Sequence, residues 1–114
     1  MDKKNKRFLN IKKTEEIKKK VIDELIDLGM PMHILGFDYW TYLIPYVYEN
    51  DIEINNMDTI YTIISEHFNT KKMAGERALR YAVNYTKEGI KEKYNIRNKI
   101  TNEAFIKLFL LKIL

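Results

Sequence analysis

The sequence of 114 residues contains no cysteine. A disulfide scaffold and a cysteine-ligated zinc site are therefore excluded, and a reducing, cytoplasmic setting is expected. Long hydrophobic runs are also missing, since no window approaches the roughly 18 apolar residues of a membrane span. The charged N-terminus lacks the apolar stretch of a secretory signal. We expect a soluble protein without a membrane partner.

Residues that commonly carry catalysis are also few. The only histidines are His33 and His67, and the sequence contains neither an HExxH pattern nor a glycine-rich phosphate loop. The carboxylates of residues 23–27 crowd one predicted helix, and nothing in the sequence argues for a partner that would raise a pKa. We predict no catalytic residue, no metal site and no cofactor, so the protein is not expected to be an enzyme.

Basic residues are missing from the middle of the chain. Residues 21–68 carry nine acidic side chains and neither lysine nor arginine. Residues 1–20 carry nine basic and three acidic side chains, and residues 69–114 carry eleven and four. Such segregation favours a polyanionic partner for the basic parts. The alternative is that basic and acidic segments pair within the fold, and composition leaves both interpretations open.

What the sequence does contain is helical periodicity, with no convincing strand. We predict an all-α fold, a compact bundle of five or six helices. Thr14 is a candidate cap for the first helix and Gly29 its stop, while Pro45 should kink the second helix or end its first half. The last helix is apolar on most sides, so it either completes the core or meets another subunit. The expected helices are 14–28, 37–48, 57–68, 71–87, a short one within 88–99, and 102–114.

One domain is expected, because a chain of this length can fill a single core. Residues 14–114 form that helical domain, and residues 1–13 form a basic, flexible arm. The arm is either a solubilising tail or a segment that lies along phosphates or in a minor groove of DNA.

The segment 71–87 has two distinct helical faces. With Thr70 as N-cap, small and apolar residues fall on one side and long polar residues on the other. Together with the helix 57–68 and a minimal turn, this predicts a helix-turn-helix. Lys71 and Lys72 oppose the helix dipole in the first turn, a penalty that a docked phosphate would reverse. The alternative is an ordinary amphipathic helix with a solvated outer face.

Three motifs in order resemble a known family. LGMPMHILG (28–36), FNT followed by ERALRYA (68–70 and 76–82) and ITNEAFI (100–106) are similar to the DNA-binding effector domain of the stage 0 sporulation protein A family, the master response regulator of endospore formation. The resemblance runs from about residue 17 to the end and is weak between Tyr85 and Lys99, where this chain is shorter. It implies a helical, winged-helix-like domain that binds a box related to TGTCGAA in the major groove, often in tandem copies.

The predicted recognition helix matches that family in part. The resemblance places Glu76, Arg77 and Arg80 at positions that meet base edges and the DNA backbone. Ala74 stands where the family has an arginine suited to guanine, so we expect a shifted or relaxed sequence preference. Gly75 replaces a larger aliphatic residue and should cost about 1 kcal/mol of helix stability relative to alanine.

These observations predict a DNA-binding transcriptional regulator whose partner is double-stranded DNA, bound as a homodimer or in tandem. The stretch before Thr14 leaves no room for a phosphate-receiving domain, so control without phosphorylation is expected. The alternative is a modulator that pairs with a full-length response regulator through the apolar C-terminal helix. The residues predicted to contact DNA are Thr70, Lys71, Lys72, Met73, Glu76, Arg77, Arg80, Asn84 and Lys87.

Overall fold

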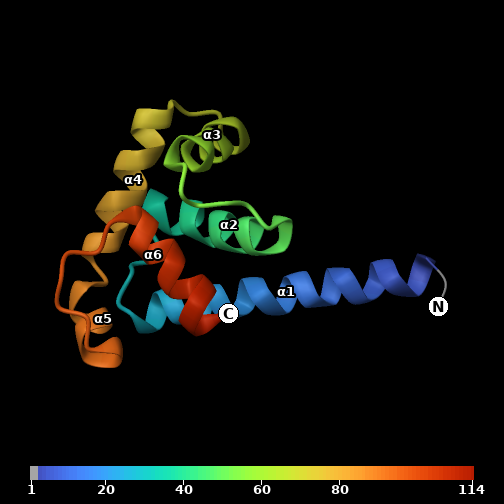
Figure 1. The fold of residues 1–114 in the computed structure, drawn as a ribbon, viewed down its shortest axis with the longest axis horizontal. Coiled ribbons are helices and arrows are strands. Elements are labelled where there is room, and N and C mark those ends of the chain that lie inside the picture. Colours follow the sequence, from blue (N-terminus) through green and yellow to red (C-terminus); the bar gives the residue numbers. More distant parts are fainter. Residues whose placement is uncertain (1–2) are drawn as a thin grey trace.

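The computed structural model describes residues 3–114, with side chains from Lys13 onward, and this part of the chain is helical with no strand. The predicted all-α class is confirmed (Figure 1), and the described residues contain no strands that could form the wing of a winged helix. The elements are α1 (Lys3–Asp27), α2 (Leu35–Asn50), α3 (Met57–Phe68), α4 (Lys72–Asn84), α5 (Lys87–Tyr94), α6 (Asn102–Leu108) and a terminal π-helical turn, η1 (Phe109–Ile113).

Helix α1 begins earlier than predicted. Its backbone is helical from Lys3, so Thr14 lies inside the helix and does not cap it. The segment expected to form a flexible arm is therefore helical from Lys3 to Lys13, while Met1 and Asp2 lie outside the described residues. A contact between this segment and DNA stays a prediction.

The end of α1 lies where the sequence predicted it. Gly29 has a φ of 99°, a left-handed conformation that favours glycine. The amide of Gly29 donates to the carbonyl of Ile26, and the amide of Met30 donates to that of Leu25, both at 3.0 Å. This pair of hydrogen bonds is the Schellman motif, which satisfies the last carbonyls and turns the chain toward α2.

Helix α2 passes through Pro45 without ending, so the expectation that Pro45 ends its first half is wrong. Pro45 is buried, and its neighbour Ile44 is completely buried in the core. A proline inside a helix costs about 3 kcal/mol, and the burial of apolar side chains around it offsets that cost. The helix continues to Asn50 and is capped by Asp51 at a φ of 53°.

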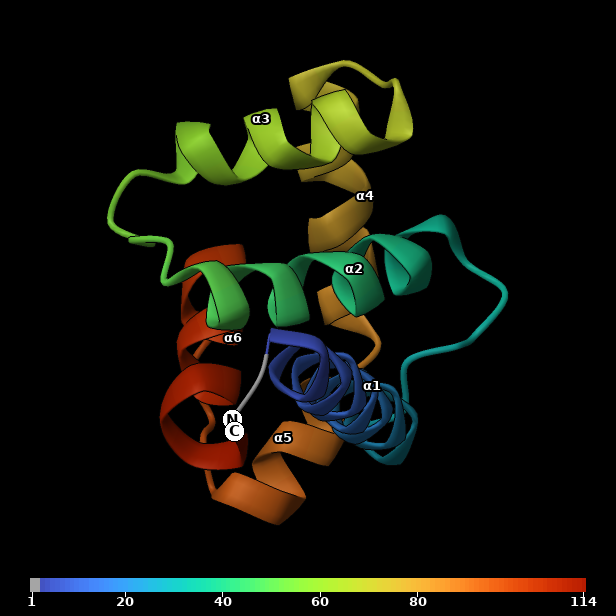
Figure 2. The ribbon, with the colours of Figure 1, turned by 90° about the vertical axis from the view of Figure 1, so that its right-hand side faces the viewer.

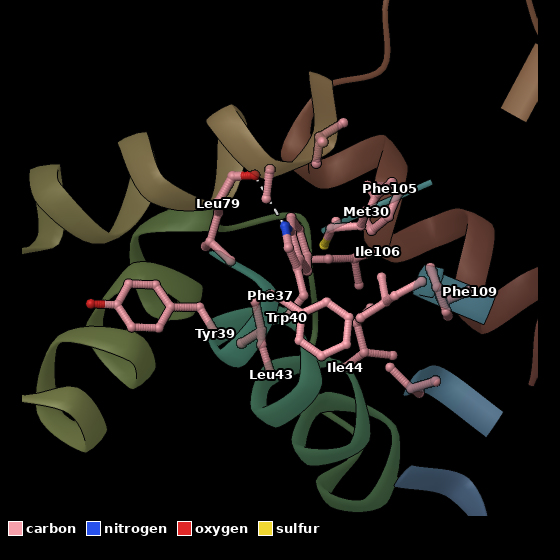
Figure 3. Packing of buried hydrophobic residues seen from close by; sticks show 14 of the residues in the cluster. Met30, Phe37, Tyr39, Trp40, Leu43, Ile44, Leu79, Phe105, Ile106 and Phe109 are labelled. Carbon is pink, nitrogen blue, oxygen red and sulfur yellow. Dashed lines mark hydrogen bonds between the residues drawn. The ribbon is translucent and has the colours of Figure 1, made fainter. Parts of the chain in front are cut away.

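The core is built around α2 (Figure 3). The indole nitrogen of Trp40 donates a hydrogen bond of 3.0 Å to the carbonyl oxygen of Leu79 in α4. The Trp40 ring also lies 4.8 Å from that of Phe105 in α6, which in turn packs against Phe109. The C-terminal helix therefore completes the core, the first of its two predicted roles, and leaves Leu111 81% exposed.

A glycine lets α2 and α4 pack in close contact. A Cβ added at Gly36 would lie 2.4 Å from the carbonyl oxygen of Ala78 and 2.5 Å from the Cβ of Ala82. Backbone atoms of Ala78 and the Cβ of Ala82 occupy that space, so no change of a neighbouring rotamer could relieve the clash. Gly36 and the two alanines together fix how deeply α4 sits against α2.

We predict that Gly36→Ala lowers the free energy of unfolding by about 1–3 kcal/mol. The better helix propensity of alanine, worth up to about 1 kcal/mol, should not compensate for pushing α2 and α4 apart. Urea unfolding followed by circular dichroism measures the change. Glu49→Ala, at an exposed position of the same helix, is the control and should change stability by less than about 0.5 kcal/mol. A Gly36→Ala protein as stable as the parent would contradict the close packing of α2 on α4.

Candidate nucleic-acid interface

Helices α3 and α4 form a helix-turn-helix (Figure 2). Helix α3 has the bounds that the sequence predicted. The chain reverses at Asn69, which has a φ of 52°. Thr70 is held to the end of α3, because its amide donates to the carbonyl of Ser65 while the Ser65 hydroxyl donates to the carbonyl of Thr70. Two hydrogen bonds between Ser65 and Thr70 therefore attach the turn to the last turn of α3.

Helix α4 is shorter than the predicted 71–87. Lys71, not Thr70, occupies the N-cap position, and the helix ends at Asn84. Lys87 is the first residue of α5. The sequence missed this break because Thr86 falls on the apolar side of the predicted helix. In the structure Thr86 is buried in the turn, and its hydroxyl donates to the carbonyl of Val83.

The inner face of α4 is the predicted one. Of the small and apolar residues on that side, four are buried within the helix, Ala78 is half-buried, and Thr86 is buried in the following turn. A Cβ added at Gly75 would lie 2.9 Å from the Cγ2 of Ile64 in α3. The glycine that weakens α4 therefore allows it to approach α3 closely. The four buried residues are Gly75, Leu79, Ala82 and Val83.

The outer face of α4 is exposed along its length. Met73 is 73% exposed, Glu76 is half-buried, and the rest of the predicted DNA-contacting residues from Lys71 to Lys87 are exposed, while Thr70 is half-buried in the turn. Most of the residues predicted to contact DNA are therefore accessible to a partner, and Lys87 lies on α5 instead of α4.

Ion pairs divide the basic residues of this face. The Nε of Arg80 lies 3.0 Å from a carboxylate oxygen of Glu76, and the Nζ of Lys72 lies 3.1 Å from Asp58 of α3. Arg77 is exposed and, among the described residues, has no carboxylate within 4.0 Å. Lys72 therefore pairs with an acidic residue within the fold, as the second interpretation of the charge pattern predicted, whereas the guanidinium of Arg77 is available to a partner.

The start of α4 differs from the starts of α3 and α6. Asn56 caps α3 by accepting from the amide of Asp58, and Thr101 caps α6 by accepting from the amide of Ala104, both at 3.1 Å. Helix α4 has no side-chain cap and no acidic residue in its first turn, which begins with Lys71 and Lys72. Its first amides and the positive end of its dipole therefore face an environment that suits an anion.

Asn102 of α6 joins both helices of the motif. Its side-chain amide donates to the Tyr61 hydroxyl in α3 and to the main-chain carbonyl of Glu76 in α4, each at 3.3 Å. The residue is buried, so these hydrogen bonds act away from bulk water. Asn102 therefore helps to set the position of α4 relative to α3.

A polar cluster holds α5 against α1. The Nζ of Lys93 lies 2.8 Å from carboxylate oxygens of both Glu24 and Asp27, and the Tyr94 hydroxyl donates to Glu24 at 2.6 Å. Partial burial, followed by the hydrogen bond to Glu24, raises the pKa of Tyr94 to about 12. The two carboxylates also raise the pKa of Lys93, because they favour its charged form. This cluster fixes the end of α5 and the start of the connection to α6.

We predict that Tyr94 titrates near pH 12 in the folded protein, about two units above an unperturbed tyrosine. The pKa of Tyr94 is higher in the folded state than in the unfolded state. Its contribution to the stability of the fold is therefore complete below pH 10 and is lost as the pH rises toward 12. The measurement is the ultraviolet absorbance of tyrosinate in the parent protein minus that of Tyr94→Phe. Glu24→Gln should move the pKa downward, and a Tyr94 that ionises near pH 10 in the folded state would show that the cluster is not formed.

A basic groove beside the end of α4 was missed by the sequence analysis. Asn84 and Lys87 line it together with Arg97, Asn98 and Lys99 from the connection between α5 and α6, and its volume is about 250 Å³. The polar stretch 88–99 showed no helical periodicity that could place it. The usable signal was the pair of isoleucines, Ile96 and Ile100, on either side of the basic tripeptide.

Among the described residues, no group of three or more histidine, cysteine or acidic side chains could hold a metal ion. No helix in the same part of the chain is long and apolar enough to cross a membrane.

The architecture is that of an all-α domain in which a helix-turn-helix presents the polar face of its second helix. The family model described as "Sporulation initiation factor Spo0A C terminal" matches residues 21–113. The chain belongs to this family, and the resemblance recognised in its three motifs is confirmed. The match begins within α1 and includes all of the helix-turn-helix and the groove.

Proposed function

We propose that this protein is a transcriptional regulator that binds double-stranded DNA with α4 in the major groove. The observation that carries the proposal is the outer face of α4, which is exposed, polar, uncapped at its basic start and mounted on α3 as the second helix of the motif. Membership of a family named for a sporulation initiation factor supports the same conclusion.

Each part of the face has chemistry that suits DNA. The free amides at the start of α4, with Lys71 beside them, suit a phosphate. Arg77 has no carboxylate partner within the described residues, so it can meet guanine or phosphate without breaking an ion pair. Asn84, one residue before the turn to α5, has the donor and acceptor that match adenine.

The pair formed by Glu76 and Arg80 has a different role. Their contact of 3.0 Å spans one helical turn and holds both side chains along the surface of α4. An exposed pair of this kind contributes at most about 1 kcal/mol to stability, so either partner can exchange its contact for one with DNA. Arg80 is then available to phosphate and Glu76 to a cytosine amino group.

We predict that Arg77→Glu combined with Arg80→Glu abolishes DNA binding, because two attractive contacts become repulsive while the buried face of α4 is unchanged. Fluorescence anisotropy measures binding to a duplex with the family-like box and to a scrambled duplex, each over a series of salt concentrations. The parent should bind less tightly as salt rises and should keep a preference for one duplex.

The matched control reverses two charges away from the motif, Lys18→Glu on α1 and Lys112→Glu on η1. This variant has the same net charge as the α4 variant and should retain the preference between duplexes. DNA affinity that survives the two changes on α4 would refute this recognition face, and a parent protein that binds neither duplex would refute the proposed function.

Ala74 permits a gain-of-function test. It is exposed in the first turn of α4, at the position where the resemblance implies an arginine. We predict that Ala74→Arg sharpens the preference for the family-like box over the scrambled duplex by about 1–3 kcal/mol, the discrimination of one bidentate contact to guanine. Ala74→Lys is the control for added charge. Equal gains on both duplexes would mean that position 74 does not face bases.

A second candidate function rests on Leu111, which is 81% exposed on the apolar C-terminal turn. Pairing with a full-length response regulator through this turn would make the protein a modulator of that regulator. The charge-reversed α4 variant separates the two functions, since it should leave such pairing intact. Control without phosphorylation and binding as a homodimer or in tandem remain predictions.

A further inference from the structure

We propose that the connection between α5 and α6 is a second DNA contact, in which Lys87, Arg97 and Lys99 bind backbone phosphates beside the site read by α4. The proposal rests on the proposed function and adds Arg97 and Lys99, which the sequence did not predict to contact DNA, to the predicted contact Lys87. Its occupant is the phosphate backbone of the same duplex, not a separate ligand.

The first support is the shared groove. Asn84 lies on the outer face of α4, and it lines one groove with Lys87, Arg97 and Lys99. Figure 1 shows this connection on the same side of the molecule as α4 and opposite the projecting α1. A duplex that lies against α4 therefore passes the connection without any rearrangement of the fold.

The second support is the charge of the groove. Lys87, Arg97 and Lys99 are exposed and, within the described part of the chain, none lies within 4.0 Å of a carboxylate. By contrast, Lys93 on the adjoining helix is held by Glu24 and Asp27. Cations of this kind, grouped around a groove, give the positive potential that attracts a polyanion.

The third support is the way in which the connection is held. Ile96 and Ile100 pack against the core, and the three residues between them point to solvent. Asn95, in a left-handed conformation with a φ of 56°, ends α5 before this stretch, and Thr101 caps α6 after it. The basic tip is therefore held at both ends, which lowers the entropy cost of ordering it on DNA.

The two surfaces should differ in what they contribute. Phosphates are the same in every sequence, so the connection should strengthen binding to all duplexes equally, whereas α4 should carry the preference between them. Affinity falls as salt concentration rises, and removing one phosphate-binding side chain should make the plot of log affinity against log salt less steep by about one unit of slope.

The test uses the double variant Arg97→Gln with Lys99→Gln in the anisotropy assay above. We expect affinity for the family-like and scrambled duplexes to fall by the same factor, on the order of tenfold, and the salt slope to fall by about two. The control is Lys18→Gln with Lys112→Gln, which removes the same charge elsewhere and should change the slope by much less. Circular dichroism confirms that each variant is folded.

A gain of charge gives the reciprocal test. Asn98→Lys adds a cation at the tip of the connection and should strengthen binding to both duplexes with a steeper salt dependence. If the glutamine variant and Asn98→Lys both bind as the parent does, while the α4 variant no longer binds, the second contact is refuted and the proposed function stands. If the parent binds neither duplex, both are refuted.

Discussion

The contact between α2 and α4 is the constraint on which the rest of the structure depends. Gly36 lets the two backbones approach, and Trp40 then reaches the carbonyl of Leu79 with its indole nitrogen. The close approach sets the depth of α4, and the hydrogen bond restricts its rotation because it is made to the main chain of the helix. The orientation of the outer face of α4 is therefore decided by the packed interface between α2 and α4.

Much of this could be predicted from the sequence, for reasons that differ between elements. Helix α3 and the inner face of α4 were predicted correctly, because a helix that is buried on one side has apolar residues at intervals of three to four positions. The sequence did not predict that α2 continues through Pro45, because local propensity disfavours a proline inside a helix. The helix is stable there because the side chains around Pro45 are buried. The early start of α1 was missed for a related reason, since residues 3–13 carry mainly charge and little apolar periodicity.

The arrangement of charges could not be predicted, because it depends on contacts between residues far apart in the chain. Composition showed that acidic and basic residues are segregated, yet it could not tell Lys93, which bonds to Glu24 and Asp27, from Arg97, which has no such partner among the described residues. For the same reason the candidate site was predicted only along α4. The basic groove needed the fold, which brings the connection between α5 and α6 beside Asn84.

Pairing of basic with acidic segments and attraction of a polyanionic partner, the two interpretations of the charge pattern, are compatible in this structure. Acidic residues of the middle segment hold Lys72 and Lys93, and both pairs join separate helices, α3 with α4 and α1 with α5. Exposed ion pairs add little stability, so their effect is mainly on position. Arg77 on α4 and Arg97 with Lys99 on the connection have no carboxylate partner among the described residues, and they lie on the elements that those pairs and the α2–α4 contact hold in place. The acidic middle segment therefore supplies the ion pairs that join separate helices, whereas the basic side chains without such partners give the charge distribution expected of a surface that meets a polyanion.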